Sequence, residues 1–494
     1  MKRRFYISTP IYYVNDKPHI GHAYTSIASD IIARSKALSG FDVHFLTGTD
    51  EHGQKIEKAA KDTNINEFVS NLSSKFASLC KLANISNTDF VRTTSEKHKS
   101  FVQSVWRKIS DAGYIYLAKY SGWYSIRDEA FYQEDDLING KAPSGADVEW
   151  IEEESYFFKL SAFQDKLLEL YEKNPTFILP AARRAETISF VKSGLKDLSI
   201  SRTTFKWGIP VPDHEEHVIY VWFDALFNYL SYQNGFWPCD LHIVGKDILR
   251  FHTVFWPAFL MAGDFELPKR VFAHGWWTNE GEKISKSLGN VIDPIKEIEK
   301  FGLDYFRYYL IRAMQFGKDG DFSQNILISL VNAELANNIG NLVQRVTSFV
   351  YKTNNGVVPT PETLTKEEVN LLDKAYDEVS CVIQSIDNQE LHSAIEHIVS
   401  LGKIANLYID KSAPWKLKNT DIKRMNTILY TLLELIKVIG ILLQPFIPDS
   451  AAKILDILQV QNRKFSAVSE KLKPGTQILL PEPIFKKIEP ITKN

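Results

Sequence analysis

The chain has 494 residues, of which 44% are hydrophobic and 24% charged, and its formal net charge at pH 7 is −2. This length allows two to four domains, and the composition is that of an ordinary soluble globular protein. The near-neutral charge argues against a generic nucleic-acid coat, although it permits a local basic patch. The cysteines Cys80, Cys239 and Cys381 form no C-x-x-C pair, so neither a disulfide framework nor a four-thiolate zinc site is expected.

Membrane and targeting signals are not expected. No run of 18 apolar residues occurs, so no transmembrane helix is predicted. Residues 2–4 are basic, but residues 5–13 already form a β-rich run that leads into the first motif described below. Because a cleavable presequence would remove that motif, we expect an untargeted, cytoplasmic protein without a membrane partner.

The first fifty residues follow a strand, helix, strand pattern. Residues 4–9 are β-rich, residues 20–39 carry apolar side chains at helical spacing, and Gly40 is predicted to stop the helix. Residues 41–46 form a second β-rich run, which ends in the segment 47–50. One βαβ unit predicts a parallel sheet with a right-handed crossover.

The pattern then changes twice. Residues 113–195 are rich in Tyr, Trp, Asp and Glu and are predicted to be an insertion, after which strands return at 218–222, 241–245 and 270–273. From about 293 the chain is predicted to be helical, with a turn-rich hinge at 318–322. Long helices are expected at 324–352, 366–387, 390–411 and 422–444, with a linker at 354–361 and an extended tail over the last 30 residues.

The first motif is Pro18-His19-Ile20-Gly21-His22, which lies where the first strand gives way to its helix. Ligands of open parallel sheets bind beyond the carboxyl ends of the strands, and backbone N–H groups at a helix N-terminus favour phosphate. Gly21 lets a nucleotide approach without a Cβ in the way, and both imidazoles can donate hydrogen bonds to an α-phosphate. The alternative is a turn with two surface histidines.

The second motif is Lys283-Ile284-Ser285-Lys286-Ser287, flanked by Gly281 and by Gly289-Asn290. Two ammonium groups in such a loop can neutralise the charge that grows on a departing pyrophosphate. Taken alone, the run is also compatible with a solvated basic loop. If folding brings the two motifs together, they form a two-sided clamp for a triphosphate.

Together the two motifs resemble the HIGH and KMSKS signatures of the class I aminoacyl-tRNA synthetases. The resemblance implies that a carboxylate attacks the α-phosphate of ATP, that pyrophosphate leaves with Mg²⁺, and that a tRNA 3′-end hydroxyl then attacks the acyl-adenylate. Orientation and electrostatics suffice for this chemistry, so no protein nucleophile is needed. The residues implied in catalysis or ATP binding are His19, Gly21, His22, Gly245, Asp247, Lys283, Ser285, Lys286 and Ser287.

Further blocks are similar to those of the methionyl-tRNA synthetases: TPIYYVN at 9–15, TGTDEHG at 47–53, WGIPVP at 207–212, YVWFDAL at 220–226 and GKDI at 245–248. The likeness runs from about residue 4 to about residue 420. It implies a methionine–tRNA ligase that serves initiation and elongation, with an apolar, aromatic thioether pocket. The methionine-binding residues implied are Ile11, Tyr13, Asp50, Trp222, Ala225, Leu226, Tyr229, Asp247, Ile248, His252 and Trp256.

The family pattern also implies roles for these residues. The sulfur would meet the backbone N–H of Ile11 and the hydroxyl of Tyr229, which His252 would orient. Asp50 would hold the substrate ammonium, and Asp247 would act near the reacting carboxylate and ribose. Taken singly, the aspartates also fit caps or turns and the aromatic residues also fit core packing. The aromatic residues implied to rearrange on binding are Tyr13, Trp222 and Trp256.

Many members of this family carry zinc knuckles with C-x-x-C pairs in the insertion. Here the corresponding segment, 121–131, contains neither cysteine nor histidine. We therefore predict a metal-free knuckle, held by pairs of the Arg127/Asp128 type and by aromatic residues, and no structural zinc. At about 80 residues the insertion is too short for the large editing domain of the isoleucine, valine and leucine enzymes, so no second hydrolytic site is expected.

The helical half is expected to bind tRNA. Asn341 and Arg345 lie four positions apart on one predicted helix face, and Trp415 follows a proline where a helix is expected to begin. In the family these positions read the CAU anticodon, with Asn341 and Arg345 on the first base and Trp415 stacked on it. The alternatives are a solvated helix face and a core tryptophan. A nearby basic cluster would steer the RNA backbone: Lys411, Lys416, Lys418, Lys423 and Arg424.

The resemblance implies an α/β fold: a doubly wound parallel-sheet, Rossmann-like catalytic domain with an inserted connective domain, followed by an α-helical bundle that binds the anticodon. The expected ligands are ATP with Mg²⁺, L-methionine and tRNA(Met). Because residue 494 leaves no room for a dimerising C-terminal module, a monomer is expected. The expected segments are two catalytic halves (1–112 and 196–292), the insertion (113–195), a stem-contact linker (293–324), the anticodon-binding domain (325–464) and a tail (465–494).

Three other functions fit parts of the sequence. Another class I synthetase without editing, such as a cysteine enzyme, conflicts with the missing zinc-ligand cysteines and with the Tyr229/Trp256 pocket. A small-molecule nucleotidyltransferase of the H-x-G-H superfamily would not need a helical half bearing Trp415. A catalytically inactive tRNA-binding paralogue conflicts with the presence of both complete motifs.

Overall fold

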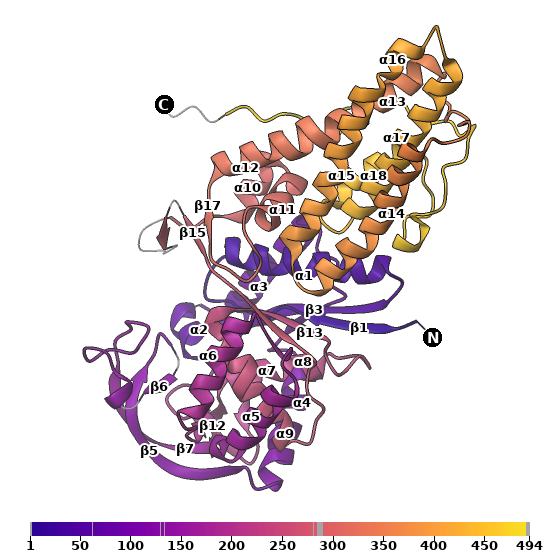
Figure 1. Cartoon of the computed structure of the whole chain (residues 1–494). Helices are drawn as coiled ribbons and strands as arrows, with labels where there is room; N and C mark the ends of the chain where they lie inside the picture. Colours follow the sequence, from indigo (N-terminus) through magenta and orange to yellow (C-terminus); the bar gives the residue numbers. More distant parts are fainter. Residues whose placement is uncertain are drawn as a thin grey trace. The chain divides into compact units, whose positions relative to one another are not determined.

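The structure is a computed structural model, which describes residues 2–61, 63–128, 130–132, 134–279, 281–283 and 290–490. The chain forms two compact units. We call them the sheet unit, made of Arg4–Pro18 and His44–His274, and the helical unit, made of Met1–Arg3, His19–Val43 and Gly275–Asn494. Figure 1 traces the chain through both units and labels many of their helices and strands.

The sheet unit is organised around a seven-stranded sheet. The strand order is β2-β3-β1-β13-β14-β8, with β4 paired to β3, and the β2–β3, β3–β4, β1–β13, β13–β14 and β14–β8 pairs are parallel. The strands are β1 Arg4–Ser8, β2 Tyr12–Tyr13, β3 Asp42–Asp50, β4 Asp89–Arg92, β8 Ile178–Leu179, β13 Leu241–Gly245 and β14 Val271–His274. A parallel sheet is therefore confirmed, and the expected strands at 4–9, 241–245 and 270–273 lie in it.

The described part of the sheet unit contains eight α-helices. They are α2 Gln54–Ala60, α3 Ile65–Leu82, α4 Glu96–Asp111, α5 Gln164–Lys173, α6 Ala181–Lys192, α7 Val221–Leu226, α8 Asn228–Ser231 and α9 Trp256–Ala262. Helices α4 to α9 contribute to a core that extends from Tyr6 on β1 to Trp256, whereas α2 and α3 pack in a second cluster with Tyr12 and Val14. A π-helical turn, Phe251–Phe255, leads directly into α9. Large aromatic residues fill this core because each buries a wide apolar surface.

Two smaller antiparallel sheets complete this unit. One has the order β6-β5-β7-β9, from β5 Ile115–Ser125, β6 Ala130–Tyr132, β7 Glu149–Phe158 and β9 Leu198–Ser199. The other has the order β10-β12-β11, from β10 Ser201–Arg202, β11 Pro210–Val211 and β12 His214–Ile219. The strand expected at 218–222 is thus partly wrong: it ends at Ile219 in an antiparallel sheet, and helix α7 begins at Val221.

The predicted insertion, 113–195, is interwoven with the main fold. Its second half supplies β8, which pairs with β14 at the edge of the parallel sheet. Conversely, β9 lies beyond residue 195 and pairs with β7. Composition cannot reveal such exchanges, because strand pairing depends on residues far apart in the chain.

The first helix of the helical unit is α1, Ile20–Leu38. Gly40, which was predicted to stop it, follows its C-cap Ser39 and has a positive φ. A three-stranded sheet has the order β16-β15-β17, from β15 Trp277–Asn279, β16 Glu282–Lys283 and β17 Gly320–Phe322. The turn-rich hinge predicted at 318–322 is therefore partly strand, paired in parallel with β15.

Long helices build the rest of this unit. They are α10 Pro294–Phe301, α11 Leu303–Arg312, α12 Gln324–Leu330, α13 Asn341–Thr353, α14 Lys366–Asp387, α15 Leu391–Ser412, α16 Pro414–Leu417, α17 Ile422–Leu443 and α18 Pro448–Ile457. A π-helical segment, Val331–Gly340, joins α12 to α13. The four expected long helices are confirmed to within two residues, whereas α18 was not predicted.

The tail packs back on the helical unit, as expected for its described part. Val357 bridges to Gln477, and the Tyr305 hydroxyl donates to the carbonyl of Lys486 at 2.9 Å. By length and composition alone, two helical segments of the described chain are apolar enough to cross a membrane, Gln324–Thr353 and Ile422–Leu443. Of the apolar window in the second, 94% is buried inside the fold, which is the pattern of a core helix.

Candidate active site

A hydrogen-bonded pair, Tyr229 and His252, lies in the interior of the sheet unit. His252 Nδ1 is 3.0 Å from the carbonyl of Ile248, and its Nε2 is 2.7 Å from the Tyr229 hydroxyl. A carbonyl only accepts, so Nδ1 carries the ring hydrogen and Nε2 accepts from the hydroxyl. Both side chains are almost fully buried. The contact implied between these residues is therefore present.

Burial keeps both members of this pair neutral. Desolvation lowers the pKa of His252 to about 4 and raises the pKa of Tyr229 well above its ordinary value. The hydroxyl hydrogen of Tyr229 consequently points at a neutral imidazole. Toward any other group, the Tyr229 oxygen can therefore only accept a hydrogen bond.

Aromatic and aliphatic side chains surround the pair. Trp222 on α7 stacks on Phe251 at 3.7 Å between ring centroids, and it lies edge-on to His252 at 6.4 Å. Trp256 is fully buried, 5.8 Å from the Tyr229 ring, and its indole nitrogen has no hydrogen-bond partner among the described residues. Of the smaller predicted wall residues, Leu226 belongs to the same core cluster, Ile248 packs against it, and Ala225 is buried on α7. Phe251 was absent from the predicted set, although it directly precedes His252.

Polar groups end two neighbouring strands of the same sheet. Tyr13 on β2 pairs with Asp50 on β3, and the N–H of Val14 donates to the carbonyl of Asp50 at 3.1 Å. Asp50 is 8% exposed, so its carboxylate is largely removed from water. Ile11 directly precedes β2 and packs against the core. The structure therefore gathers three of the predicted residues at one sheet edge.

Gly245 and Asp247 form a tight turn at the end of β13. A Cβ on Gly245 would lie 2.5 Å from the Asp247 carboxylate, so a larger residue would force that side chain to move. Only glycine leaves this carboxylate its present place. This steric fit gives a local reason for a glycine two positions before Asp247.

In the helical unit, His19 and His22 cap the start of α1. His19 Nδ1 accepts from the N–H of Gly21 at 3.1 Å, and His22 Nδ1 accepts from the N–H of His19 at 3.0 Å. Each neutral ring therefore carries its hydrogen on Nε2. A Cβ on Gly21 would lie 2.9 Å from the His19 ring, so glycine is needed for this arrangement.

One expectation about this helix start is wrong. Its backbone N–H groups were expected to favour phosphate, but the imidazoles occupy two of them, and the N–H of Ile20 donates to the carbonyl of Ile292 at 3.1 Å. These backbone N–H groups therefore already have hydrogen-bond acceptors. Any anion at this helix start therefore meets side-chain N–H groups first.

The lysine motif is only partly described. Lys283 belongs to β16, whose Thr278–Lys283 pairing fixes its backbone, while Ser285, Lys286 and Ser287 lie outside the described residues. The amide of Asn279 donates to the carbonyl of Asn290 at 3.0 Å, so the described residues on either side of the motif are held together. Through Ile20 and Ile292, the start of the first motif contacts the segment that follows the second.

Arg345 and Trp415 lie together in the helical bundle. The guanidinium of Arg345 is 5.5 Å from the centre of the Trp415 ring and 2.7 Å from the Asp410 carboxylate. Trp415 is 44% exposed, which excludes a core role for this indole. Asn341 is exposed one turn before Arg345 on α13.

The basic cluster near Trp415 is partly neutralised. Lys411, Lys423 and Arg424 pair with Glu367, Glu362 and Glu368 at 2.6–2.9 Å. These pairs leave less positive charge for RNA than a count of lysines and arginines suggests.

The predicted knuckle is held by polar and aromatic contacts. Arg127 lies 3.6 Å from Asp128, which also accepts from the hydroxyls of Tyr132 and Ser144. Trp123 and Trp150 pack edge to face at 5.3 Å. No group of three or more His, Cys, Asp or Glu side chains is placed to hold a metal ion in the part of the chain that the structure describes.

Comparison with known proteins decides the family. A model of "tRNA synthetases class I (M)" matches residues 5–147 and 133–347, and one of the "Anticodon binding domain of methionyl tRNA ligase" matches 358–493. The chain is 55% identical to the methionine–tRNA ligase of Rickettsia felis over 99% of both chains, and 49% identical to that of Brucella suis over 98% of both. A Mycobacterium tuberculosis methionyl-tRNA synthetase in complex with methionyl-adenylate matches with a TM-score of 0.95 and 45% identity, over 98% of this chain and 99% of that one.

This chain belongs to the methionyl-tRNA synthetases of class I.

Membership of the methionyl-tRNA synthetases settles two of the alternatives. The match of residues 358–493 to the anticodon-binding domain of methionyl tRNA ligase, and the 55% identity to a named methionine–tRNA ligase, place the chain with neither a cysteine-specific enzyme nor a small-molecule nucleotidyltransferase. The fold class expected from the sequence, a Rossmann-like α/β catalytic part followed by a helical bundle, is confirmed by the structural match.

The methionyl-tRNA synthetase fold also contains a buried network that the sequence did not reveal. Asp224 on α7 accepts from His52 Nδ1 at 2.6 Å and from His98 Nε2 at 2.7 Å. The Ser231 hydroxyl lies 2.9 Å from His98 Nδ1. Burial alone would raise the pKa of Asp224, but the two histidines outweigh it and hold the pKa below its usual range. The network ties the loop after Asp50 to the helix that carries Trp222.

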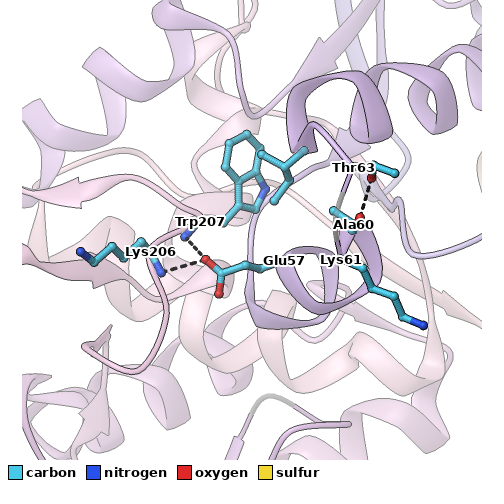
Figure 2. A pocket seen from close by; sticks show the side chains of 7 residues that line it. Glu57, Ala60, Lys61, Thr63, Lys206 and Trp207 are labelled. Atoms are coloured by element: carbon cyan, nitrogen blue, oxygen red, sulfur yellow. Dashed lines mark hydrogen bonds between the residues drawn. The ribbon is translucent and has the colours of Figure 1, made fainter.

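A separate pocket of about 310 Å³ lies beside the same loop of the synthetase. Figure 2 shows its walls, which come from α2, the start of α3 and the segment around Trp207. None of the residues predicted to bind methionine or ATP lines it. The lining residues are Glu57, Ala60, Lys61, Thr63, Ile65, Lys206 and Trp207.

Proposed function

We propose that this chain is a methionine–tRNA ligase that activates L-methionine with ATP and then transfers the methionyl group to the 3′ end of tRNA(Met). In the first step the methionine carboxylate attacks the α-phosphate of ATP, which forms methionyl-adenylate and releases pyrophosphate. In the second step the tRNA hydroxyl attacks the adenylate carbonyl, and AMP leaves. The observation that carries this function is full-length likeness to named methionine–tRNA ligases, together with a structural match to a synthetase bound to methionyl-adenylate.

In the sheet unit we assign methionine recognition to the residues that surround Tyr229. The stacked Trp222 and Phe251 offer a polarisable wall suited to a thioether. Because the hydroxyl hydrogen of Tyr229 already points at His252, we assign the Ile11 N–H as the hydrogen-bond donor to sulfur. Tyr229 is assigned a van der Waals contact with the sulfur. Asp50 is assigned to the substrate ammonium, since a buried carboxylate favours a cation.

Asp247 and the first motif are assigned to ATP and the reacting groups. Asp247, folded over Gly245, would contact the ribose and lie near the methionine carboxylate. His19 and His22 would donate from Nε2 to phosphate oxygens, because their Nδ1 atoms serve the helix cap. Charge stabilisation of this kind acts where negative charge builds up in the transition state.

The lysine loop is assigned to the departing pyrophosphate. Lys283 and Lys286 would neutralise its charge, with Ser285 and Ser287 as further donors. Mg²⁺ would come with ATP, because this ion keeps several waters and binds mainly through substrate phosphates. The described residues include no cluster suited to a dedicated metal site, so no step is assigned to a protein-bound ion.

The helical unit is assigned to the CAU anticodon through Asn341, Arg345 and Trp415. The exposed Trp415 ring beside Arg345 suits an unstacked base, which aromatic and guanidinium planes bind by stacking. We further propose that the ligase acts as a monomer in the cytoplasm without a membrane partner.

Pyrophosphate exchange with each of the amino acids in turn tests the function. Exchange that depends on methionine, without tRNA, is expected. Exchange with another amino acid would refute the assignment, and no exchange at all would favour a catalytically inactive paralogue.

The clamp is tested with Lys286→Ala. Loss of one ammonium from the leaving group is expected to slow methionine-dependent exchange by about 100-fold or more, while methionine still binds in equilibrium dialysis. Exchange at the wild-type rate would remove the loop from catalysis.

A further inference from the structure

The pocket beside Trp207 combines three kinds of groups. Trp207 is half-buried and contributes an aromatic surface, Lys61 and Lys206 contribute exposed ammonium groups, and Glu57 contributes a carboxylate. Within the described part of the chain, neither lysine forms an ion pair. Figure 2 shows the two lysines on opposite sides of Glu57, with their ammonium ends directed away from it.

Glu57 is fixed in place rather than loose in the pocket. One of its oxygens accepts the backbone N–H groups of Lys206 and Trp207 at 3.1 and 3.2 Å, as the dashed lines in Figure 2 show. A carboxylate has more acceptor positions than these two bonds use. It can therefore also accept from an amino group on a ligand.

Together these groups disfavour a ligand that carries only one kind of charge. The carboxylate disfavours a free anion, and the two ammonium groups disfavour a metal cation. A nucleotide of adenine, cytosine or guanine satisfies all of them, because its base has a π-face and an exocyclic amine while its flanking phosphates are anionic. The volume of about 310 Å³ lies within the range of small-ligand pockets.

Two hydrogen bonds join the Trp207 wall of the pocket to the loop that follows Asp50. The indole N–H of Trp207 donates to the carbonyl of Glu51 at 2.6 Å, and the N–H of Gly53 donates to the carbonyl of Trp207 at 3.0 Å. Asp50 is the residue assigned above to the ammonium of methionine. A tRNA end that reaches activated methionine must therefore pass close to this loop.

We propose that this pocket binds a nucleotide of the single-stranded 3′ end of tRNA. The base stacks on Trp207 and donates its exocyclic amine to Glu57, and Lys61 and Lys206 contact the phosphates on either side. Each base of a C-C-A end carries such an amine, whereas uracil does not. The proposal rests on the proposed function, since it takes tRNA as the substrate.

The test uses the full chain with Lys61→Ala and Lys206→Ala combined. Two RNAs are compared by equilibrium binding: tRNA(Met) and the same tRNA without its last three nucleotides. The double variant is expected to bind full-length tRNA about 5- to 20-fold more weakly and to bind the truncated tRNA as the wild type does. Its salt dependence of binding is expected to flatten by about 0.7 per lysine, the value for a single-stranded phosphate contact.

Lys58→Ala is the matched control, because Lys58 is an exposed lysine on α2, three positions before Lys61, that does not line the pocket. It is expected to bind both RNAs as the wild type does. Methionine-dependent exchange should stay within about twofold of wild type in every variant, which shows that the fold and the adenylation site are intact.

Three results would overturn the proposal. Equal losses for both RNAs would place the lysines on another part of tRNA. Unchanged binding of full-length tRNA would remove RNA from the pocket altogether. Loss of methionine-dependent exchange in the double variant, but not in Lys58→Ala, would indicate that the two lysines act in adenylation. Failure of the proposed function is distinct, since wild-type protein would then show no methionine-dependent exchange.

Discussion

At the scale of single residues, burial decides what each polar group can do. The Tyr229 hydroxyl was expected to meet the substrate sulfur, with His252 orienting it. The structure adds a direction: the ring hydrogen on Nδ1 serves the carbonyl of Ile248, so the hydroxyl hydrogen goes to Nε2. The first motif shows the same principle, because His19 and His22 use their Nδ1 atoms as helix caps.

The buried neutral state of His252 makes stability depend on pH. Its pKa is about 4 in the folded chain against an ordinary 6.5, so between these values the unfolded chain binds a proton that the folded chain does not. Stability from this group is complete above pH 6.5 and falls as pH drops towards 4, by about 3 kcal/mol in total. In His252→Gln that part of the fall should vanish, as urea titrations at several pH values would measure. Equal pH dependence in both proteins would contradict the assigned charge state.

The exposed indole of Trp415 gives a test of anticodon reading. Trp415→Ala is expected to lower kcat/KM for tRNA charging about 5- to 100-fold, because base stacking contributes about 1–3 kcal/mol. Methionine-dependent exchange should not change, since it needs no tRNA. Trp150→Ala removes an indole of the sheet unit that is 51% exposed and serves as the control. Unchanged charging by Trp415→Ala would remove this residue from the anticodon site.

At the scale of elements, irregular turns contain or directly precede predicted site residues. The π-turn Phe251–Phe255 contains His252, and the π-segment Val331–Gly340 ends just before Asn341. Wide turns of this kind occur often at functional sites, because they redirect side chains that a regular helix would place elsewhere. Helical periodicity in the sequence predicts the helices but not these local changes of pitch.

Asp224 joins three elements of the sheet unit and gives a test at this scale. Asparagine has one acceptor oxygen and no charge, so in Asp224→Asn the side chain can no longer accept from both His52 and His98 in their present roles. The loop after Asp50 and helix α7 should then shift, and the KM for methionine in exchange should rise about tenfold while the KM for ATP stays within twofold. Asp197→Asn, which alters a carboxylate bonded to Tyr116, is the control. Equal changes in both KM values would indicate general unfolding instead.

At the scale of the whole molecule, zinc analysis tests whether polar and aromatic contacts hold the knuckle together without a structural metal. Arg127, Asp128 and the Trp123–Trp150 pair already hold this segment together. Elemental analysis of the purified protein is expected to find far less than one zinc per chain. Exchange should survive dialysis against a chelator once Mg²⁺ alone is restored. Stoichiometric zinc, or activity that only zinc restores, would show that the segment binds metal.

The sequence alone predicts the features that depend on near neighbours. The α14 bounds, 366–387, follow from helical periodicity, and the structure adds a capping box in which Glu368 bonds back to Thr365. The first motif and Gly40 likewise mark the two ends of α1. These signals are local, because helix bonds and caps join residues within about four positions.

Only the tertiary structure decides the contacts between distant residues. The sequence could not place β8 beside β14, could not turn β12 antiparallel, and could not bring His52 and His98 onto Asp224. It also could not show that the imidazoles would occupy the backbone donors of α1. In each case the partner is chosen by packing and burial of groups far apart along the chain, and no local pattern encodes that choice.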